Sequence, residues 1–153
     1  MPPLPPFPLP SLAATEALAA HLAPFLRARD VVGLQGDLGA GKTTFARALL
    51  HALGIDEDVP SPTFTLVQNY AGKVFPIYHF DLYRLKSASE LEEIGWDDAC
   101  ADGLVLVEWP ERAASYMPHD GLDILFNIGS QNHRVATLTP RGLLEKRFEG
   151  FGA

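Results

Sequence analysis

Eight consecutive residues in the first third of the chain have the types and spacing of a phosphate-binding loop. They satisfy the pattern G-x-x-x-x-G-K-[ST] and are Gly36, Asp37, Leu38, Gly39, Ala40, Gly41, Lys42 and Thr43. In such a loop the glycines let backbone N–H groups face an anion, and the partial positive charge of a following helix N-terminus lies at the same point. Composition alone would give roughly 0.002 matches in a chain of 153 residues. The pattern therefore predicts a nucleotide-binding site.

Two side chains at the end of this loop would act directly on the phosphates. Lys42, expected as an exposed loop cation, would place a mobile positive charge on the β- and γ-phosphate oxygens. The Thr43 hydroxyl would ligate Mg²⁺, and Thr44 follows it within the binding segment. The predicted chemistry is the binding of a nucleotide together with Mg²⁺.

Phosphate chemistry also needs a carboxylate opposite the loop, at the carboxyl end of a neighbouring parallel strand, to hold the metal directly or through water. Glu108 follows the apolar run 103–107, which predicts a buried central strand, so we favour Glu108 as the metal ligand with Thr43. Asp81 follows residues 77–80, but Pro76 favours an edge strand there. Asp81 therefore stays open to two interpretations, a water-positioning group in catalysis or a cap for the turn that follows.

Trp109 and Pro110 directly follow Glu108 and restrict the backbone at that point. Ordinary packing and a contact with the nucleotide are both consistent with Trp109 at this position. The five histidines of the chain have neither the spacing of a zinc site nor that of a catalytic triad. Only His79, two residues before Asp81, stays of interest for the site.

The elements around the loop alternate between strand and helix patterns. Residues 31–34 form a short apolar run, and the helix pattern after the loop carries one apolar stripe and ends near Gly54. Further strands are predicted over residues 66–70, 74–80, 103–107, 122–128 and 134–138, and further helices over residues 11–24, 87–95 and 140–148. This order predicts an α/β fold of the P-loop NTPase type, with a mainly parallel central sheet flanked by helices and additional C-terminal strands.

Six of the first ten residues are proline, and prolines lack the backbone donors that a helix or a central strand needs. We therefore predict a flexible arm over residues 1–10, either disordered or a polyproline ligand for a partner groove. Residues 11–153 are predicted to form a single domain.

Composition excludes several classes of protein. The chain has 12 Lys and Arg against 19 Asp and Glu, a formal charge of −7, and its basic residues are scattered, which argues against a chain that grips nucleic acid by itself. The single cysteine cannot form an intramolecular disulfide, which favours a reducing, cytoplasmic compartment. No apolar run approaches the ~18 residues of a membrane span, and no secretion signal is recognisable at the start, so neither secretion nor a membrane role is expected.

Five sequence blocks resemble the bacterial TsaE (YjeE) family in order and spacing. They read GDLGAGKTTF from residue 36, SPTFTLV from 61, YHFDLYRL from 78, EEIG from 92 and VEWPE from 107. The strong likeness covers residues 31–112, while the proline-rich start departs from the family's usual short start. The resemblance implies a P-loop ATPase required for threonylcarbamoylation of the tRNA adenosine beside the anticodon.

The resemblance also implies partners. In that family the transferase is a separate protein, TsaD, paired with TsaB, and TsaE binds the pair, hydrolyses ATP and resets the complex. Transfer RNA would then be contacted only through TsaD and TsaB, which agrees with the acidic charge of the chain. The phosphate loop carries over directly, and Asp81, Glu108 and Trp109 match family positions, so catalytic roles fall to Lys42, Asp81 and Glu108.

A switch-like segment is implied over residues 61–65. Ser61, Thr63 and Thr65 belong to it, and the hydroxyls of Thr63 and Thr65 would lie near the γ-phosphate. A polar loop with two prolines can become ordered around a phosphate and relax after hydrolysis. Neither Arg84 nor Arg112 is clearly placed to assist hydrolysis, so we expect a slow ATPase that its partners accelerate.

Two other functions share the same loop. A small-molecule kinase would also use Lys42 and Thr43, but such enzymes usually close an arginine-bearing lid, and the arginines here are isolated apart from Arg27 and Arg29. A nucleotide-gated binding module would use ATP to control docking, with hydrolysis incidental. Single-turnover hydrolysis with and without the partner pair separates this module from a true ATPase.

Overall fold

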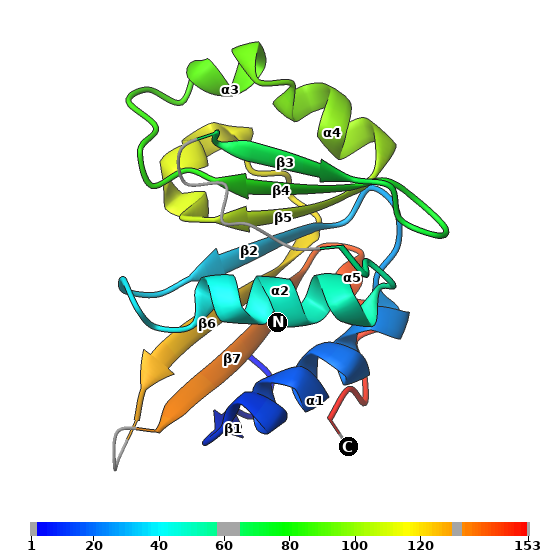
Figure 1. The fold of residues 1–153 in the computed structure, drawn as a ribbon, viewed down its shortest axis with the longest axis vertical. Coiled ribbons are helices and arrows are strands. Elements are labelled where there is room, and N and C mark those ends of the chain that lie inside the picture. Colours follow the sequence, from blue (N-terminus) through cyan, green and yellow to red (C-terminus); the bar gives the residue numbers. More distant parts are fainter. Residues whose placement is uncertain (1–2, 58–64, 130–132, 153) are drawn as a thin grey trace.

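The structure is a computed structural model that describes residues 3–57, 65–129 and 133–152. Strands from these residues form one seven-stranded sheet in the order β1-β7-β6-β2-β5-β4-β3 (Figure 1). The strands are β1 (Phe7–Leu9), β2 (Val31–Gln35), β3 (Val67–Tyr70), β4 (Ile77–Asp81), β5 (Leu104–Glu108), β6 (Gly121–Ile128) and β7 (Arg134–Arg141). The four inner strands β6, β2, β5 and β4 are parallel, and β1, β7 and β3 add antiparallel pairs outside them. The predicted α/β fold, with additional C-terminal strands, is confirmed.

Helices cover both faces of this sheet. They are α1 (Leu12–Leu22), α2 (Lys42–Ala52), α3 (Glu90–Glu93), α4 (Trp96–Asp102) and α5 (Leu144–Arg147), with 3₁₀ turns η1 (Ala23–Phe25) and η2 (Pro110–Tyr116). Side chains of α1, α2 and α5 share one buried cluster with Val32 and Leu106, whereas α3, α4 and η2 share a second with Val31 and Val105. Since neighbouring residues of a strand point to opposite faces, the two clusters lie on opposite sides of the sheet. In Figure 1, α1 and α2 lie in front of the sheet.

The phosphate loop joins the middle of the sheet to α2. Strand β2 pairs in parallel with β5 on one side and β6 on the other, which explains its unbroken apolar run. Helix α2 buries its apolar stripe, which includes Phe45, Ala46, Leu49 and Leu50. Gly54 follows with φ of +95°, a left-handed conformation that glycine adopts without steric cost. The predicted strand, loop and helix are all present.

The proline-rich start is not a free arm over its whole length. Residues 7–9 form β1, which pairs antiparallel with β7 at the edge of the sheet, and the Leu4 N–H donates to the Leu138 carbonyl at 2.8 Å. Leu4 and Leu9 are buried in the core. The prediction of a flexible arm is wrong for these residues, because an edge strand needs backbone donors on one side only and tolerates proline. Helix α1 then begins as predicted, with Ser11 Oγ accepting from the Ala14 N–H at 3.1 Å.

Two other local predictions need correction. Strand β4 is not an edge strand, since it lies between β5 and β3; Pro76 precedes it and uses only its carbonyl, which accepts from the Leu104 N–H at 3.0 Å. The sequence predicts one helix over residues 87–95, which ends at Gly95, and so does not predict α4. Gly95 has φ of +82° and joins the two short helices.

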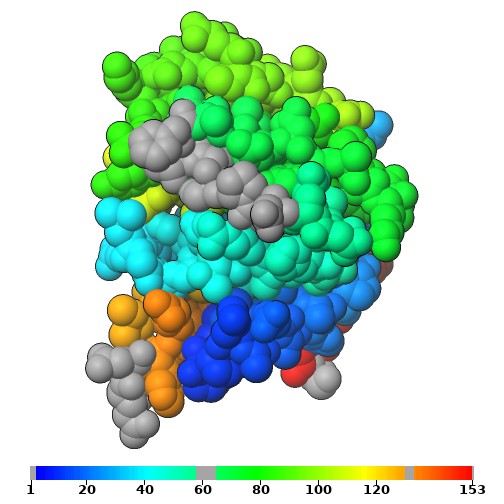
Figure 2. All heavy atoms as spheres, in the orientation of Figure 1, coloured from blue at the N-terminus to red at the C-terminus, as the bar shows by residue number. Residues whose placement is uncertain are grey.

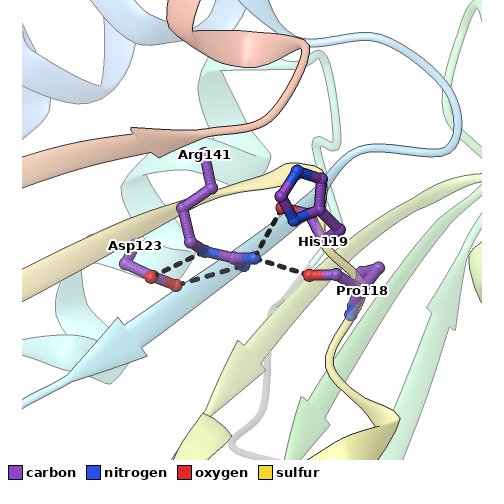
Figure 3. Close-up of polar contacts among 4 residues, drawn as sticks. All are labelled: Pro118, His119, Asp123 and Arg141. Carbon is purple, nitrogen blue, oxygen red and sulfur yellow. Dashed lines mark hydrogen bonds and ion pairs between the residues drawn. The ribbon is translucent and has the colours of Figure 1, made fainter. Parts of the chain in front are cut away.

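The predicted helix over residues 140–148 is shorter than expected, because β7 continues to Arg141 and α5 covers only Leu144–Arg147. Pro140 lies beyond the part of β7 that pairs with β1. The sheet therefore loses no hydrogen bond through the missing N–H of this proline. The Arg141 guanidinium holds this end of the strand, because its Nε donates to Asp123 Oδ2 of β6 at 2.8 Å and the carbonyls of Pro118 and His119 also accept from it (Figure 3). The strand therefore extends two residues past the point where the sequence predicts a helix.

Candidate nucleotide site

A cavity of about 480 Å³ opens at the carboxyl ends of β2, β4 and β5, beside the start of α2. It is lined by Leu38, Gly39, Gly41, Lys42, Thr43, Thr44, Asp81, Tyr83, Arg84, Glu108, Trp109 and Arg134. Ligands of open parallel sheets bind at this end of the strands. Figure 2 shows the loop after β2 at the molecular surface, coloured cyan, between green segments above and orange segments below. Five of the eight predicted loop residues and both predicted carboxylates thus surround one space, whereas Gly36, Asp37 and Ala40 do not line it.

The loop has the backbone that its glycines permit. Gly36, Gly39 and Gly41 have φ of +143°, +79° and +110°. At Gly36 a Cβ atom would come within 2.6 Å of the Phe126 carbonyl oxygen, so a side chain is excluded there by space as well as by conformation. Helix α2 begins at Lys42, which places its unpaired N–H groups and its positive dipole end beside the cavity.

Lys42 is not the exposed cation that the sequence suggests. Its side chain is only 4% exposed, its Nζ donates to the Gly36 carbonyl, and Nζ lies 3.3 Å from the centre of the Trp109 ring. Burial lowers the pKa of Lys42, and the nearby carboxylates, Glu108 first among them, oppose that effect. The ammonium therefore lies inside the loop, against an aromatic face.

Thr43 and Glu108 meet as predicted for a metal site. Thr43 Oγ1 donates to Glu108 Oε1 at 2.8 Å, and the second carboxylate oxygen lies 2.7 Å from His79 Nε2. Since the Thr43 proton points to Glu108, the lone pairs of the hydroxyl oxygen are left for a cation. The described part of the chain holds no cluster of three or more His, Cys, Asp and Glu side chains suited to a metal. One hydroxyl and one carboxylate fit Mg²⁺, which keeps several waters and takes further ligands from phosphates.

Comparison with known proteins agrees with this geometry. The model of the family described as threonylcarbamoyl adenosine biosynthesis protein TsaE matches residues 9–136. The tRNA threonylcarbamoyladenosine biosynthesis protein TsaE of Rickettsia felis is 40% identical over 125 residues, 81% of this chain and 73% of that protein. The Bacillus subtilis protein of the same name is 40% identical over 129 residues, 84% of this chain and 80% of that protein. The chain belongs to the TsaE family.

A solved structure supports the same assignment. The crystal structure of Bacillus subtilis YdiB superposes with a TM-score of 0.83 at 31% identity, over 99% of this chain and 96% of that one. The TsaE family functions in the biosynthesis of threonylcarbamoyladenosine in tRNA, which establishes the process to which this member belongs. In the part of the chain that the structure describes, no helix is both long enough and apolar enough to cross a membrane.

Asp81 of this TsaE family member caps the turn after β4 and also lines the cavity, and its water-positioning role stays a prediction. It lies opposite Glu108 in the β4–β5 register and lines the cavity. Its Oδ1 also accepts from the Tyr83 N–H at 3.0 Å, so it caps the turn after β4. Trp109 likewise packs and faces the site: its ring lies 5.0 Å from the Tyr83 ring and beneath Lys42, with a left-handed backbone of φ +61°. A non-glycine residue in that conformation is held there by its surroundings, here the wall of the cavity.

Arg134 is a site residue that sequence reasoning missed. It comes from β7 and its Nη2 donates to the Gly39 carbonyl at 3.1 Å, across 95 residues of chain. It lines the main cavity and also a smaller adjoining one of about 130 Å³, beside Pro10 and Ser11. Arg84 lines the main cavity too, whereas Arg112 donates to the Leu85 carbonyl and does not line it. No local pattern marks Arg134, since only the pairing of β6 with β7 brings it to the loop.

The predicted switch segment falls largely outside the structure. Ser61 and Thr63 lie outside the described residues. Thr65 is exposed and is not among the residues that line the cavity; its hydroxyl donates to the Val67 carbonyl at 3.3 Å and accepts from Gln68 Nε2 at 3.2 Å. The role of these three hydroxyls stays a prediction.

Proposed function

We propose that this protein is a Mg²⁺-dependent ATPase that acts on the TsaD–TsaB pair during threonylcarbamoylation of tRNA. The observation that carries the proposal is the hydrogen bond from Thr43 to Glu108 at the N-terminus of α2, in a chain of the TsaE family. It joins the last residue of the phosphate loop to a carboxylate of the neighbouring parallel strand. One buried ammonium, Lys42, and two buried carboxylates, Asp81 and Glu108, line the same cavity and supply groups for the phosphates and for the metal.

Each residue has a role that follows from its position. The loop from Gly36 to Thr43 and the N-terminus of α2 would bind the phosphates, and the Lys42 ammonium would neutralise part of their charge. Thr43 and Glu108 would hold Mg²⁺, which when bound supplies neutralisation of the charge on the β- and γ-phosphates. Asp81, fixed by its turn, would orient the attacking water.

Hydrolysis by the isolated chain is expected to be slow. An arginine supplied to the γ-phosphate is worth about 10³–10⁵ in rate in related phosphoryl transfers. Two arginines line the cavity. Arg134 donates to the Gly39 carbonyl at the loop, on the β7 side of the site and away from Glu108 and Asp81, and we propose that Arg84 reaches the γ-phosphate only when the partners are bound. TsaD and TsaB would therefore speed the reaction by ordering residues 61–65 or by adding a charge. The net charge of −7 favours contact with tRNA through these partners.

The test compares phosphate release by the chain alone and with purified TsaD and TsaB. We expect steady-state release to rise well above the rate of the isolated chain when the pair is added, and Lys42→Ala to abolish release in both conditions. Single-turnover measurements identify the step that changes. Rapid turnover that the partners leave unchanged would refute the proposal, and partner binding gated by ATP without any hydrolysis would favour a binding module.

A further inference from the structure

His79 is completely buried in the middle of β4, on the face of the sheet that α2 covers. Its strand neighbours in register are Leu106 of β5 and Gln68 of β3. An imidazole in such a place costs free energy unless its nitrogens form hydrogen bonds. The hydrogen bonds of this side chain therefore indicate its role.

Among the described residues, the ring makes its polar contact with Glu108. His79 Nε2 lies 2.7 Å from Glu108 Oε2, while Thr43 Oγ1 donates to Oε1. An ionised carboxylate only accepts hydrogen bonds, so Nε2 carries the proton and donates. The other ring nitrogen, Nδ1, is buried without a hydrogen-bond partner among the described residues. An apolar side chain at this position would avoid that unpaired nitrogen, so packing alone does not account for histidine.

The two donors together fix the carboxylate. The terminal torsion of a glutamate is broad, so a single hydrogen bond would leave the carboxylate plane free to turn. Here one oxygen is held from β4 by His79 and the other from α2 by Thr43, and the Glu108 side chain is almost fully buried between them. Removal of the β4 donor would leave one oxygen unpaired and the plane unfixed.

We infer that His79 is a positioning residue that orients Glu108 toward the cation held with Thr43. His79 itself does not line the nucleotide cavity. The inference rests on the proposed function for the presence of Mg²⁺ at this site. Hydrogen-bond partners of metal-binding side chains typically contribute 10- to 100-fold to metal affinity.

The experiment uses the full chain with three substitutions. His79→Leu removes the donor, and His79→Gln places an amide N–H about where Nε2 lies. Ile77→Val is the matched control, since Ile77 is buried on the same face of β4. This substitution removes one methylene group and no hydrogen-bond donor to Glu108. For each variant, ADP binding is measured by titration calorimetry in EDTA and over a series of Mg²⁺ concentrations, after circular dichroism confirms folding.

Mg²⁺ is expected to tighten ADP binding, and the Mg²⁺ concentration that gives half of this effect measures metal affinity. We expect His79→Leu to raise that concentration by about tenfold or more and to leave the affinity for ADP in EDTA unchanged. His79→Gln should restore most of this loss, and Ile77→Val should match the wild type. If His79→Leu does not fold, His79→Asn, whose shorter amide does not reach Glu108, should show the same loss.

The outcomes separate two failures. If the wild type responds to Mg²⁺ and His79→Leu responds equally, the positioning role is refuted while the proposed function stands. If affinity in EDTA falls as much as affinity in Mg²⁺, or if glutamine is as harmful as leucine, the residue is merely structural and the inference is wrong. If ADP binding by the wild type is indifferent to Mg²⁺, the metal requirement fails and the role of His79 fails with it.

Discussion

The buried ammonium of Lys42 allows nucleotide binding to be separated from folding by one substitution. Lys42→Met keeps most of the apolar stem and removes the charge. In the folded chain the side chain is 4% exposed, and burial lowers its pKa against the opposing effect of Glu108 and other carboxylates. The charge is thus present for the ligand and costs the fold a desolvation penalty.

The change in stability can be estimated from the contacts. The variant loses the interaction of Nζ with the Trp109 ring at 3.3 Å, about 0.5–2 kcal/mol, and a charged hydrogen bond to Gly36, about 1.5–3 kcal/mol. It avoids the burial of an ammonium, which costs several kcal/mol after relaxation. Since these contributions nearly cancel, we expect the free energy of unfolding to change by at most about 2 kcal/mol. In a chain of this size that is a shift in Tm of no more than about 8 °C.

Nucleotide affinity should fall much further. Loss of a charged hydrogen bond to phosphate, about 1.5–3 kcal/mol, corresponds to roughly 10- to 150-fold weaker binding. Calorimetric titration with ATP and thermal unfolding without ligand measure the two effects. Lys86→Met is the control, because Lys86 is exposed and lies outside the cavity. An unfolded Lys42→Met chain, or one that binds ATP as tightly as the wild type, would refute the reasoning.

The lowered pKa of Lys42 also predicts a pH dependence. Because the folded chain releases this proton at a lower pH than the unfolded chain, the unfolded chain binds more protons in the alkaline range below the ordinary value of 10.5. The contribution of Lys42 to stability therefore rises with pH in that range. We expect the free energy of unfolding of the wild type, measured with denaturant, to rise relative to that of Lys42→Met as pH increases. A difference that is constant with pH contradicts the assigned burial.

Four further substitutions test the site. Glu108→Gln keeps shape and loses charge, so ATP binding in EDTA should stay close to wild type while its Mg²⁺ dependence weakens; if Asp81→Asn does this instead, the ranking of the two carboxylates is wrong. Arg134→Ala should weaken ADP binding several-fold in calorimetry, because it removes a cation that lines the cavity and bonds the loop, and unchanged affinity would remove Arg134 from the site. Thr65→Ala should reduce stimulation by TsaD and TsaB more than it reduces ATP affinity, and equal losses would count against a switch.

The loop and the elements beside it are predictable because their information is local. The glycines, Lys42 and Thr43 lie within one short segment, and the period of apolar residues on either side defines a buried strand and an amphipathic helix. Even the meeting of Thr43 with Glu108 follows from sequence, since a buried apolar run predicts a central parallel strand and such strands end at a common edge. The same reasoning located Asp81 and Trp109 at the site, without deciding how each is used.

Tertiary structure decided what depends on pairings between distant segments. Residues 7–9 become a strand because β7 offers them an edge, and Pro8 is tolerated there because its missing donor faces away from the ladder. Arg134 reaches the loop only through the register of β6 with β7, and His79 meets Glu108 only because β4 lies inside the sheet, beside β5. The sequence predicts which residues carry phosphate chemistry, because that information is local. Which side chains hold them in place is decided by strand order, which no short segment contains.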